Sequence, residues 1–387
     1  MNLRNKLASR LKLVKPSATL RISAMAKELA RQGKPVIDMS VGEPDFKTPA
    51  HIIEGAIKAL NDGKVFYTPT RGIPELLEAI AEKLRRENDI DASPENIIVT
   101  PGAKYAIFEA IMATIDEGDE VILLDPSWVS YEPCILMAGG KPVWVPYTSD
   151  FKDAPIEEYI TPKTKMIIIN TPNNPLGIVY SLDFLKKIRD LAVDHDLLVL
   201  SDEIYEKIVF EGKHISIASL DDMFERTITV NGFSKTYAMT GWRLGYAVAN
   251  EEIIKSMNKI QSHSVSHPTS FVQYAGVIAL KSDQSFINRM VEEFKVRRDI
   301  LVKGLNELEL EYAPPMGAFY VFVNVEMDGL KFCEEMLKRE FVALTPGEAF
   351  GKAYKKWVRI SYATSRENIK DFLSRLERFQ KIYKSIN

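Results

Sequence analysis

The sequence TITVNGFSKTYAMTGWRLGYAV, residues 227–248, contains two short apolar runs separated by a polar segment. The runs TITVN (227–231) and LGYAV (244–248) have the length of buried β-strands. Lys235 and Arg243 lie between them, so we expect both cations near one end of a sheet. Ligands of open α/β sheets bind beyond the carboxyl ends of the strands, and Lys235 is therefore well placed to face a bound molecule.

Similar apolar runs alternate with helical patterns in the preceding part of the chain. Helical spacing of apolar residues predicts crossover helices over 103–115 and 182–196. This alternation is typical of a mostly parallel sheet covered by helices. The five further predicted strands are IIVT (97–100), EVILL (120–124), PVWVP (142–146), KMIIIN (165–170) and LLVLSD (197–202).

The pattern changes after residue 285. A long charged helix is predicted over 287–308, strands over 318–325 and 355–363, and a final amphipathic helix after them. We therefore expect an α/β protein with two domains. A mostly parallel seven-stranded sheet would form the large domain, residues 46–290, and both chain ends, 1–45 and 291–387, a smaller α/β domain.

Composition excludes several classes of function. The 387 residues carry 50 Lys and Arg against 53 Asp and Glu, a net charge of −3 that argues against nucleic-acid binding. No apolar run approaches the ~20 residues of a membrane helix, so we expect no membrane partner. The N-terminal MNLRNKLASRLKLVKP reads as an amphipathic segment and not a signal peptide, which makes the cytoplasm the expected location.

The two cysteines indicate neither a metal site nor a disulfide. Cys134 and Cys333 lie in apolar stretches without CxxC or Cys/His spacing. We expect both to be buried free thiols and expect no bound metal.

Lys235 and the motif SDEIYE (201–206) suggest covalent chemistry. A lysine that forms an imine must lose its proton part of the time, and burial near another cation lowers its pKa. Asp202 ends a predicted strand, where its carboxylate could keep the nitrogen of a bound pyridine ring protonated. The phenol of Tyr205 could bond the 3′ oxygen of the same ring. Alternatively, Lys235 is a surface lysine, and Asp202 caps a helix.

Two turns that follow strands offer further ligands. In IINTPNNPLG (168–177), Asn174 can direct an amide toward a cofactor, although turn formation alone explains the Asn-Pro and Gly residues. In PGAKYAIFEAI (101–111), Gly102 and Ala103 open a helix whose N–H groups suit a phosphate. A plain strand-to-helix turn would account for the same glycine.

Trp128 and Arg359 are the remaining candidates. The indole of Trp128, shortly after the strand 120–124, could stack on a heteroaromatic ring, although burial in a core is the common fate of tryptophan. Arg359 lies in the apolar run 355–363, and its planar guanidinium suits a substrate carboxylate. An internal salt bridge is the competing explanation.

Together these segments resemble the fold-type I pyridoxal-phosphate enzymes, and among them the class I aminotransferases of the aspartate aminotransferase kind. The resemblance runs nearly from end to end. The segments that carry it are 16–46, 66–81, NNPLG, SDEIYE, SKTYAMTGWRLGY and VRISYATSRENI.

The resemblance implies that the large domain binds pyridoxal 5′-phosphate. It makes Lys235 the imine-forming lysine and proton carrier, Asp202 the partner of the pyridine nitrogen, and Tyr205 and Asn174 the ligands of the 3′ oxygen. For the phosphate it implies Gly102, Ala103, Lys104 and Arg243, with Tyr67 from the other subunit of a homodimer, and it adds Ser234 as a further cofactor-binding residue. Trp128 would stack on the ring and contact the substrate. The substrate carboxylate would be held by Arg359, Gly42 and Asn174.

Three features depart from the family pattern. Gly232 replaces a hydroxyl residue that many relatives carry three positions before the lysine, and Leu176 replaces the usual small polar residue after Asn-Pro. No arginine for a distal substrate carboxylate is evident after KIQSHSVSHPTSF (259–271). The preferred amino acid, whether aspartate, aromatic, alanine or a broad set, is therefore left open.

The expected reaction is ping-pong transamination from an L-amino acid, aspartate or a broad or aromatic set, to 2-oxoglutarate. A carbon–sulfur lyase or an aminocyclopropane-carboxylate synthase of the same fold is the rival within the family. A regulatory module fused to a winged-helix domain is the rival from another class. That reading needs ~70–100 extra residues at the start and a basic charge, and the chain has neither.

Overall fold

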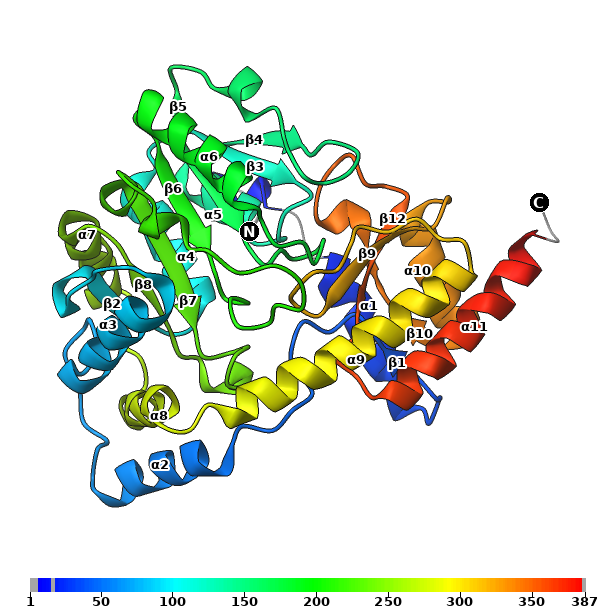
Figure 1. The fold of residues 1–387 in the computed structure, drawn as a ribbon, viewed down its shortest axis with the longest axis horizontal. Coiled ribbons are helices and arrows are strands. Elements are labelled where there is room, and N and C mark those ends of the chain that lie inside the picture. Colours follow the sequence, from blue (N-terminus) through cyan, green and yellow to red (C-terminus); the bar gives the residue numbers. More distant parts are fainter. Residues whose placement is uncertain (1–5, 15–17, 385–387) are drawn as a thin grey trace.

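The computed structural model describes residues 6–14 and 18–384, and its largest element is a seven-stranded sheet (Figure 1). The strands lie in the order β2-β8-β7-β6-β5-β3-β4. Their bounds are β2 (Ile97–Thr100), β3 (Glu120–Asp125), β4 (Lys141–Pro146), β5 (Thr164–Asn170), β6 (Leu198–Asp202), β7 (Thr227–Gly232) and β8 (Gly245–Val248). The mostly parallel seven-stranded sheet predicted from the sequence is confirmed.

Strand β8 runs antiparallel to both of its neighbours, β7 and β2, whereas the other pairs are parallel. Gly232 at the end of β7 is in register with Gly245 at the start of β8. The loop 233–244 therefore begins and ends at the carboxyl edge of the parallel strands. This reversal brings Lys235 and Arg243 to the edge where ligands of such sheets bind.

Both faces of the sheet are covered, which explains why its strands are nearly continuous apolar runs. Along β5, Met166 and Ile168 belong to one core cluster and Ile167 and Ile169 to another, because successive side chains point to opposite faces. The helices of the chain are α1 (Ala18–Arg31), α2 (Ala50–Asn61), α3 (Pro74–Asn88), α4 (Ala103–Thr114), α5 (Tyr131–Ala138), α6 (Leu182–Asp194), α7 (Glu251–Ser262), α8 (Ser270–Lys281), α9 (Ser285–Glu307), α10 (Gly329–Glu340) and α11 (Arg366–Lys384).

Two small sheets lie on the other side of the molecule (Figure 1). One pairs β1 (Ile37–Asp38) with β10 (Val342–Ala343), and so joins the two ends of the chain. The other is antiparallel, with β12 (Trp357–Ser361) between β11 (Thr345–Pro346) and β9 (Tyr320–Asn324). Helix α9 crosses the predicted domain boundary at residue 290, and α11 packs along it. The boundaries themselves stay a prediction.

The sequence did not reveal the two-residue strands β1, β10 and β11 or the reversal of β8, because these depend on pairing partners far away in the chain. Cys134 and Cys333 are buried and free, as predicted. Of the predicted amphipathic N-terminus, residues 1–5 and 15–16 lie outside the described residues. In the described part, Leu7, Leu11 and Leu13 are exposed around the 3₁₀ turn η2 (Ser9–Lys12).

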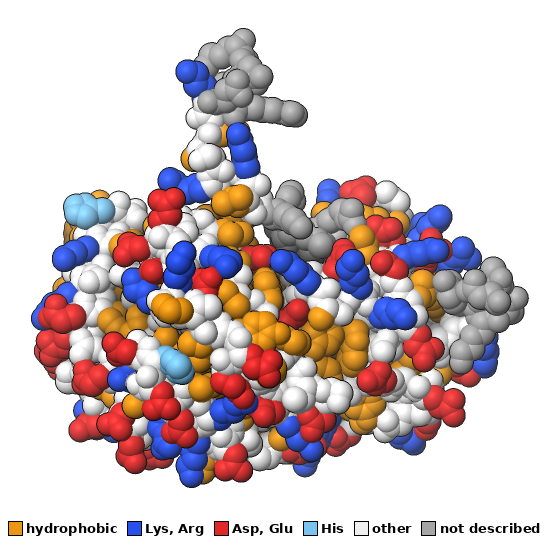
Figure 2. All heavy atoms as spheres, turned by 90° about the horizontal axis from the view of Figure 1, so that it is seen from above, with side chains coloured by type: hydrophobic (Ala, Val, Ile, Leu, Met, Phe, Trp, Pro, Cys, Tyr) orange, Lys and Arg blue, Asp and Glu red, His pale blue; other side chains and the backbone are white. Residues whose placement is uncertain are grey.

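The surface agrees with the balanced composition. Acidic and basic side chains are interspersed over the face drawn in Figure 2, with apolar patches between them. Among the described residues, no helix is both long enough and apolar enough to span a bilayer.

Candidate active site

A cavity of about 470 Å³ opens at the carboxyl edge of the large sheet. Eleven of the thirteen residues proposed from the sequence line it, and only Gly102 and Tyr67 do not. Those eleven residues are Gly42, Ala103, Lys104, Trp128, Asn174, Asp202, Tyr205, Ser234, Lys235, Arg243 and Arg359. Tertiary folding therefore brings together residues that are up to 317 positions apart, counted from 42 to 359.

Lys235 is largely buried in the loop between β7 and β8, and its Nζ donates to the carbonyl oxygen of Gly42 at 2.5 Å. The pKa of Lys235 is lowered to about 8, mainly by burial and also by Arg359 and Arg243, whereas Glu43 and Asp202 oppose the shift. The alternative of a surface lysine is wrong. A lysine in this state supplies an unprotonated amine near neutral pH.

Asp202 ends β6 with its carboxylate directed into the cavity. Its Oδ2 accepts a hydrogen bond from the Tyr131 hydroxyl at 2.6 Å, and its Oδ1 accepts the N–H of Ile204 at 3.3 Å. Burial raises the pKa of Asp202 to about 6, although the bond from Tyr131 lowers it. No helix begins here, because residues 204–207 form turns, so the helix-cap alternative is wrong.

Arg359 is a buried cation on β12 with no carboxylate within ion-pair distance among the described residues. Its Nη1 donates to Oδ1 of Asn174 at 3.0 Å and its Nη2 to the carbonyl oxygen of Ser40 at 2.6 Å. Its Nε is buried and has no partner in the part of the chain that the structure describes, and burial lowers the pKa of the guanidinium. The alternative of an internal salt bridge is therefore not favoured, and the site is suited to an external anion.

The guanidinium of Arg359 also lies over two aromatic rings. Its Cζ lies 4.5 Å from the ring centre of Tyr320 and 5.0 Å from that of Phe350. The hydroxyl of Tyr320 is 2.9 Å from that of Tyr205. The position of Arg359 is thus linked to the residue expected to bond the 3′ oxygen.

The N-terminus of α4 and the side chain of Arg243 form a second cationic region. Gly102 precedes the helix with φ of +87°, and a Cβ at this position would lie 2.5 Å from Nη2 of Arg243. Only glycine allows this approach. Within residues 6–14 and 18–384, no side chain caps α4, and Arg243 bonds only carbonyl oxygens, those of Thr240 and Pro101. Backbone N–H groups and a guanidinium without a carboxylate partner suit a phosphate.

The remaining proposed residues have different environments. Trp128 packs edge-on against Tyr131, and the Nζ of Lys104 lies 5.0 Å from its ring centre. Burial lowers the pKa of Lys104. Tyr67 lies outside the cavity of its own chain, where it is 92% exposed.

The departure at Gly232 has a steric reason. A Cβ there would lie 2.9 Å from the Cα of Gly245 and 3.1 Å from the carbonyl oxygen of Leu244. Strands β7 and β8 approach too closely for a hydroxyl side chain at this point. Leu176 is fully buried and belongs to a core cluster, so its apolar side chain fits its surroundings.

The comparisons with known proteins agree with this geometry. The family model "Aminotransferase class I and II" matches residues 34–376. The chain belongs to this family. It is 44% identical to the aromatic-amino-acid aminotransferase 2 of Thermococcus litoralis, over 97% of this chain and 98% of that one. It is 45% identical to the aspartate aminotransferase of Pyrococcus abyssi, over 96% and 97%.

Among solved structures, the Thermus thermophilus aspartate aminotransferase with maleate matches with a TM-score of 0.93 and 43% identity, over 96% of this chain and 99% of that one. The protein is accordingly a transaminase. The family uses pyridoxal phosphate.

The sequence did not reveal some residues that shape this aminotransferase's site. Tyr131 and Tyr320 bond the proposed catalytic residues, and Phe350 stacks on Arg359. Aromatic residues of this kind are most often part of a core, so their type carries no signal. For Tyr131 one signal was present, because it follows Trp128 by three residues.

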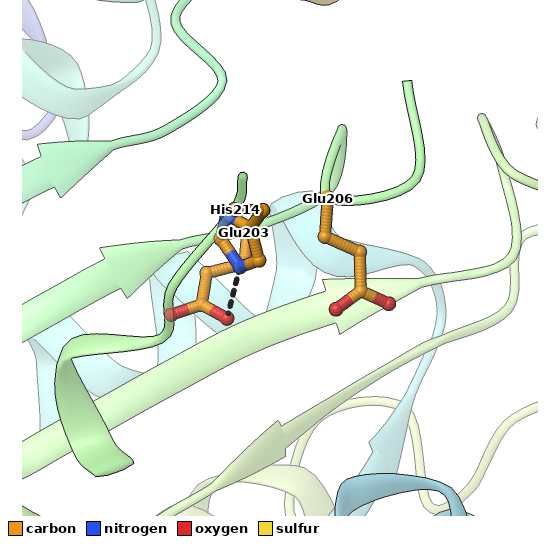
Figure 3. Close-up of side chains that lie close together, drawn as sticks. All are labelled: Glu203, Glu206 and His214. Carbon is orange, nitrogen blue, oxygen red and sulfur yellow. Dashed lines mark hydrogen bonds and ion pairs between the residues drawn. The ribbon is translucent and has the colours of Figure 1, made fainter. Parts of the chain in front are cut away.

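A cluster of charges lies beside the aminotransferase site, where Glu203, Glu206 and His214 come together (Figure 3). The Nε2 of His214 is 3.0 Å from Oε2 of Glu203. Burial raises the pKa of Glu206, but Lys83, His214 and Lys207 together outweigh this effect and lower the pKa to about 2. Lys83 already pairs with Glu206, and the hydroxyls of Ser201 and Ser216 donate to Glu203, so these carboxylates are bonded within the protein, whereas the Nδ1 of His214 is buried without a partner among the described residues.

Proposed function

We propose that the protein is a pyridoxal-phosphate-dependent aminotransferase that moves an amino group from an L-amino acid to 2-oxoglutarate by a ping-pong mechanism. The observation that carries the proposal is the buried Lys235, whose pKa is lowered to about 8 in a cavity shared with Asp202 and Arg359. A role in amino-acid metabolism in the cytoplasm is part of the same proposal.

The residues around the cavity fit the cofactor. Gly102, the N–H groups of Ala103 and Lys104, Ser234 and Arg243 would hold its phosphate. The glycine-only approach of Gly102 to Arg243 supports this assignment. When bound, the cofactor's protonated ring accepts the electron pair left by removal of the substrate's α-proton.

Other residues would orient the ring and keep it protonated. Asp202, anionic above about pH 6, would pair with the ring nitrogen. Tyr205 and the amide Nδ2 of Asn174 would donate to the 3′ oxygen, since Oδ1 of Asn174 already accepts from Arg359. Trp128 would stack on the ring from the cavity wall.

Lys235 would hold the cofactor through its Nζ and, when released, take the α-proton of the substrate. Its lowered pKa supports this role, because a general base works best when its pKa is near the working pH. Arg359 would bind the α-carboxylate, with Gly42 and Asn174 beside it. A carboxylate there would pair the buried Nε, which has no partner among the described residues.

The part of the cavity that would receive the side chain of the substrate combines charge and apolar surface. Lys104 forms no ion pair among the described residues, and Trp128 and Ile107 supply apolar wall next to it. Such a site suits both acidic and aromatic side chains. The names of the relatives, which include aspartate and aromatic aminotransferases, support the same two classes.

We also propose a homodimer with shared active sites. Val65, Phe66 and Tyr67 form a run of apolar side chains with 55%, 79% and 92% of their surfaces exposed. A run of this kind is typical of an interface. Tyr67 would reach the phosphate site of the other subunit, and size-exclusion chromatography with light scattering tests the assembly.

The decisive experiment is a half-reaction screen. Protein loaded with pyridoxal phosphate is mixed with single amino acids, and the loss of its visible absorbance is recorded. Rapid conversion by aspartate, phenylalanine or tyrosine, with return on addition of 2-oxoglutarate, is the expected result. Release of pyruvate and thiol from a cysteine conjugate without any 2-oxo acid would instead support the carbon–sulfur lyase, and no visible absorbance at all would overturn both readings.

A further inference from the structure

The carboxylate of Asp125 is enclosed by the backbone of a loop that belongs to the other end of the chain. Asp125 ends β3 and is 4% exposed. Its Oδ2 accepts the N–H groups of Lys352 and Ala353, each at 3.3 Å. A Cβ at Gly351 would lie 1.6 Å from Oδ1, so only glycine leaves room for the carboxylate.

The same two segments are joined by a backbone hydrogen bond, from the N–H of Ser127 to the carbonyl oxygen of Phe350 at 2.7 Å. Each segment also contributes an aromatic side chain to the cavity, Trp128 from one and Phe350 from the other. The contact therefore connects two walls of the active site that come from β3 and from the loop before β12.

Phe350 is the link between this contact and the substrate site. One face of the Arg359 guanidinium lies on its ring, with 5.0 Å between Cζ and the ring centre. Because Phe350 directly precedes Gly351, the position of its ring depends on the course of the loop 350–353. A loop that moved away from Asp125 would remove one of the two ring contacts that orient Arg359.

Stability alone does not account for a carboxylate at this position. Burial raises the pKa of Asp125 to about 6, while the N–H groups of Ala353 and Lys352 oppose the shift. Its Oδ1 is buried and accepts no hydrogen bond from the described residues. An anion with so little compensation costs folding free energy, and an apolar residue would avoid this cost.

We propose that Asp125 is a positioning residue for the substrate-carboxylate site, because it fixes the loop 350–353 and thereby the Phe350 ring against Arg359. The inference rests on the proposed function in one respect, the role of Arg359 toward the substrate carboxylate. It adds a residue that does not line the cavity.

The first test compares Asp125→Ala and Asp125→Asn in the cofactor-loaded enzyme. Alanine removes both acceptor oxygens, so we expect the KM of both the amino acid and the 2-oxo acid to rise about 10-fold, with kcat within about 3-fold. Asparagine keeps one acceptor and should bring KM back to within about 3-fold of the wild type. Asp150→Ala is the matched control, because Asp150 accepts the N–H of Lys152 in an exposed loop.

A second test uses Gly351→Ala. Gly351 is not among the glycines with positive φ, and the three atoms nearest to an added Cβ all belong to Asp125, so the collision with this side chain is the main obstacle to alanine. We expect Gly351→Ala alone to raise KM, and to have a much smaller effect when combined with Asp125→Ala, since the collision is then gone. Additive effects of the two substitutions on KM would overturn the proposal.

Two measurements separate this inference from the proposed function. Hydrogen exchange of the amides of residues 350–354 should accelerate in Asp125→Ala and not in Asp150→Ala. Calorimetric titration with maleate and with 3-phenylpropanoate, carboxylates without an amino group, should show weaker binding in Asp125→Ala. Faster exchange with unchanged KM and unchanged carboxylate affinity would overturn the positioning role. Absence of transamination in the wild type would refute the proposed function, and exchange and titration would still decide the role of Asp125.

Discussion

The guanidinium of Arg359 donates to the amide oxygen of Asn174 across 3.0 Å, and this bond joins a strand of the small antiparallel sheet to a turn at the edge of the large one. The bond leaves the NH₂ of Asn174 available for the cofactor and the outer N–H groups of Arg359 available for a substrate. Recognition of the substrate and orientation of the cofactor are thus linked through one pair of side chains.

Replacing Arg359 with lysine should abolish most substrate recognition. Lysine cannot reproduce the planar fork or its contacts with the rings of Tyr320 and Phe350. We expect kcat/KM to fall about 30-fold to several thousand-fold, equivalent to about 2–5 kcal/mol. Steady-state kinetics with both substrates measures this effect. Arg366→Lys, which changes an exposed ion pair with Glu293, is the control; equal losses in the two variants would contradict the assignment.

Lys235→Ala should remove both the covalent attachment of the cofactor and the proton carrier. We expect turnover to fall by at least about 10²–10⁴-fold and the visible absorbance of the attached cofactor to be lost. Methylamine added in solution should restore part of the activity, since it can replace the missing amine. Lys281→Ala, at an exposed position on α8, should change neither property. Full turnover in Lys235→Ala would refute the role.

Glu109→Gln should change how stability depends on pH. Glu109 lies in α4 and is fully buried, and neither carboxylate oxygen has a hydrogen-bond partner of good geometry among the described residues. Burial raises its pKa to about 8, although the hydroxyl of Tyr105 opposes the shift. Because this folded-state pKa is above the unfolded value of about 4.5, the folded state holds the proton between the two values, and stability falls as pH rises from about 4.5 to 8. In the variant, the decrease in the free energy of unfolding over this pH range should be smaller by up to about 3–5 kcal/mol.

Urea denaturation of Glu109→Gln and the wild type at pH 5 and pH 8.5 measures the effect. The advantage of the variant should be larger at pH 8.5. Glu292→Gln, at an exposed position on α9, should show no such difference. Parallel pH profiles for Glu109→Gln and the wild type would show that the carboxyl is not neutral in the folded protein.

Tyr131→Phe should weaken cofactor binding without opening a cavity. The 2.6 Å hydrogen bond from Tyr131 lowers the pKa of the Asp202 carboxyl, and the substitution removes this bond. A hydrogen bond to a charged group contributes about 1.5–3 kcal/mol, so we expect the Kd of pyridoxal phosphate to rise about 10-fold or more. Fluorescence titration of the cofactor-free protein measures Kd. Tyr312→Phe removes a hydrogen bond to Asn306 far from the site, and an equal change there would exclude a specific role for Tyr131.

Much of the fold could be predicted because buried parallel strands are nearly continuous apolar runs. The seven strands of the large sheet follow directly from that pattern. Residues such as Lys235, Asp202 and Arg359 could be found from the sequence because they lie next to or within apolar strands. Burial of a charged group is costly, so a charged residue at such a position is a candidate for a functional role. Tyr320 and Phe350 could not be found in this way, since an aromatic residue in a core and one that orients an arginine have the same local sequence.

The sequence by itself therefore determined the α/β class, the strands and the charged residues of the candidate site. The tertiary structure decided which of them meet. It reversed β8 so that Lys235 lies at the carboxyl edge, and it joined Asp125 to the backbone of Lys352, 227 positions later in the chain. The physical reason is that apolar periodicity reports burial within one element, whereas a contact between distant elements depends on how all of them pack at once.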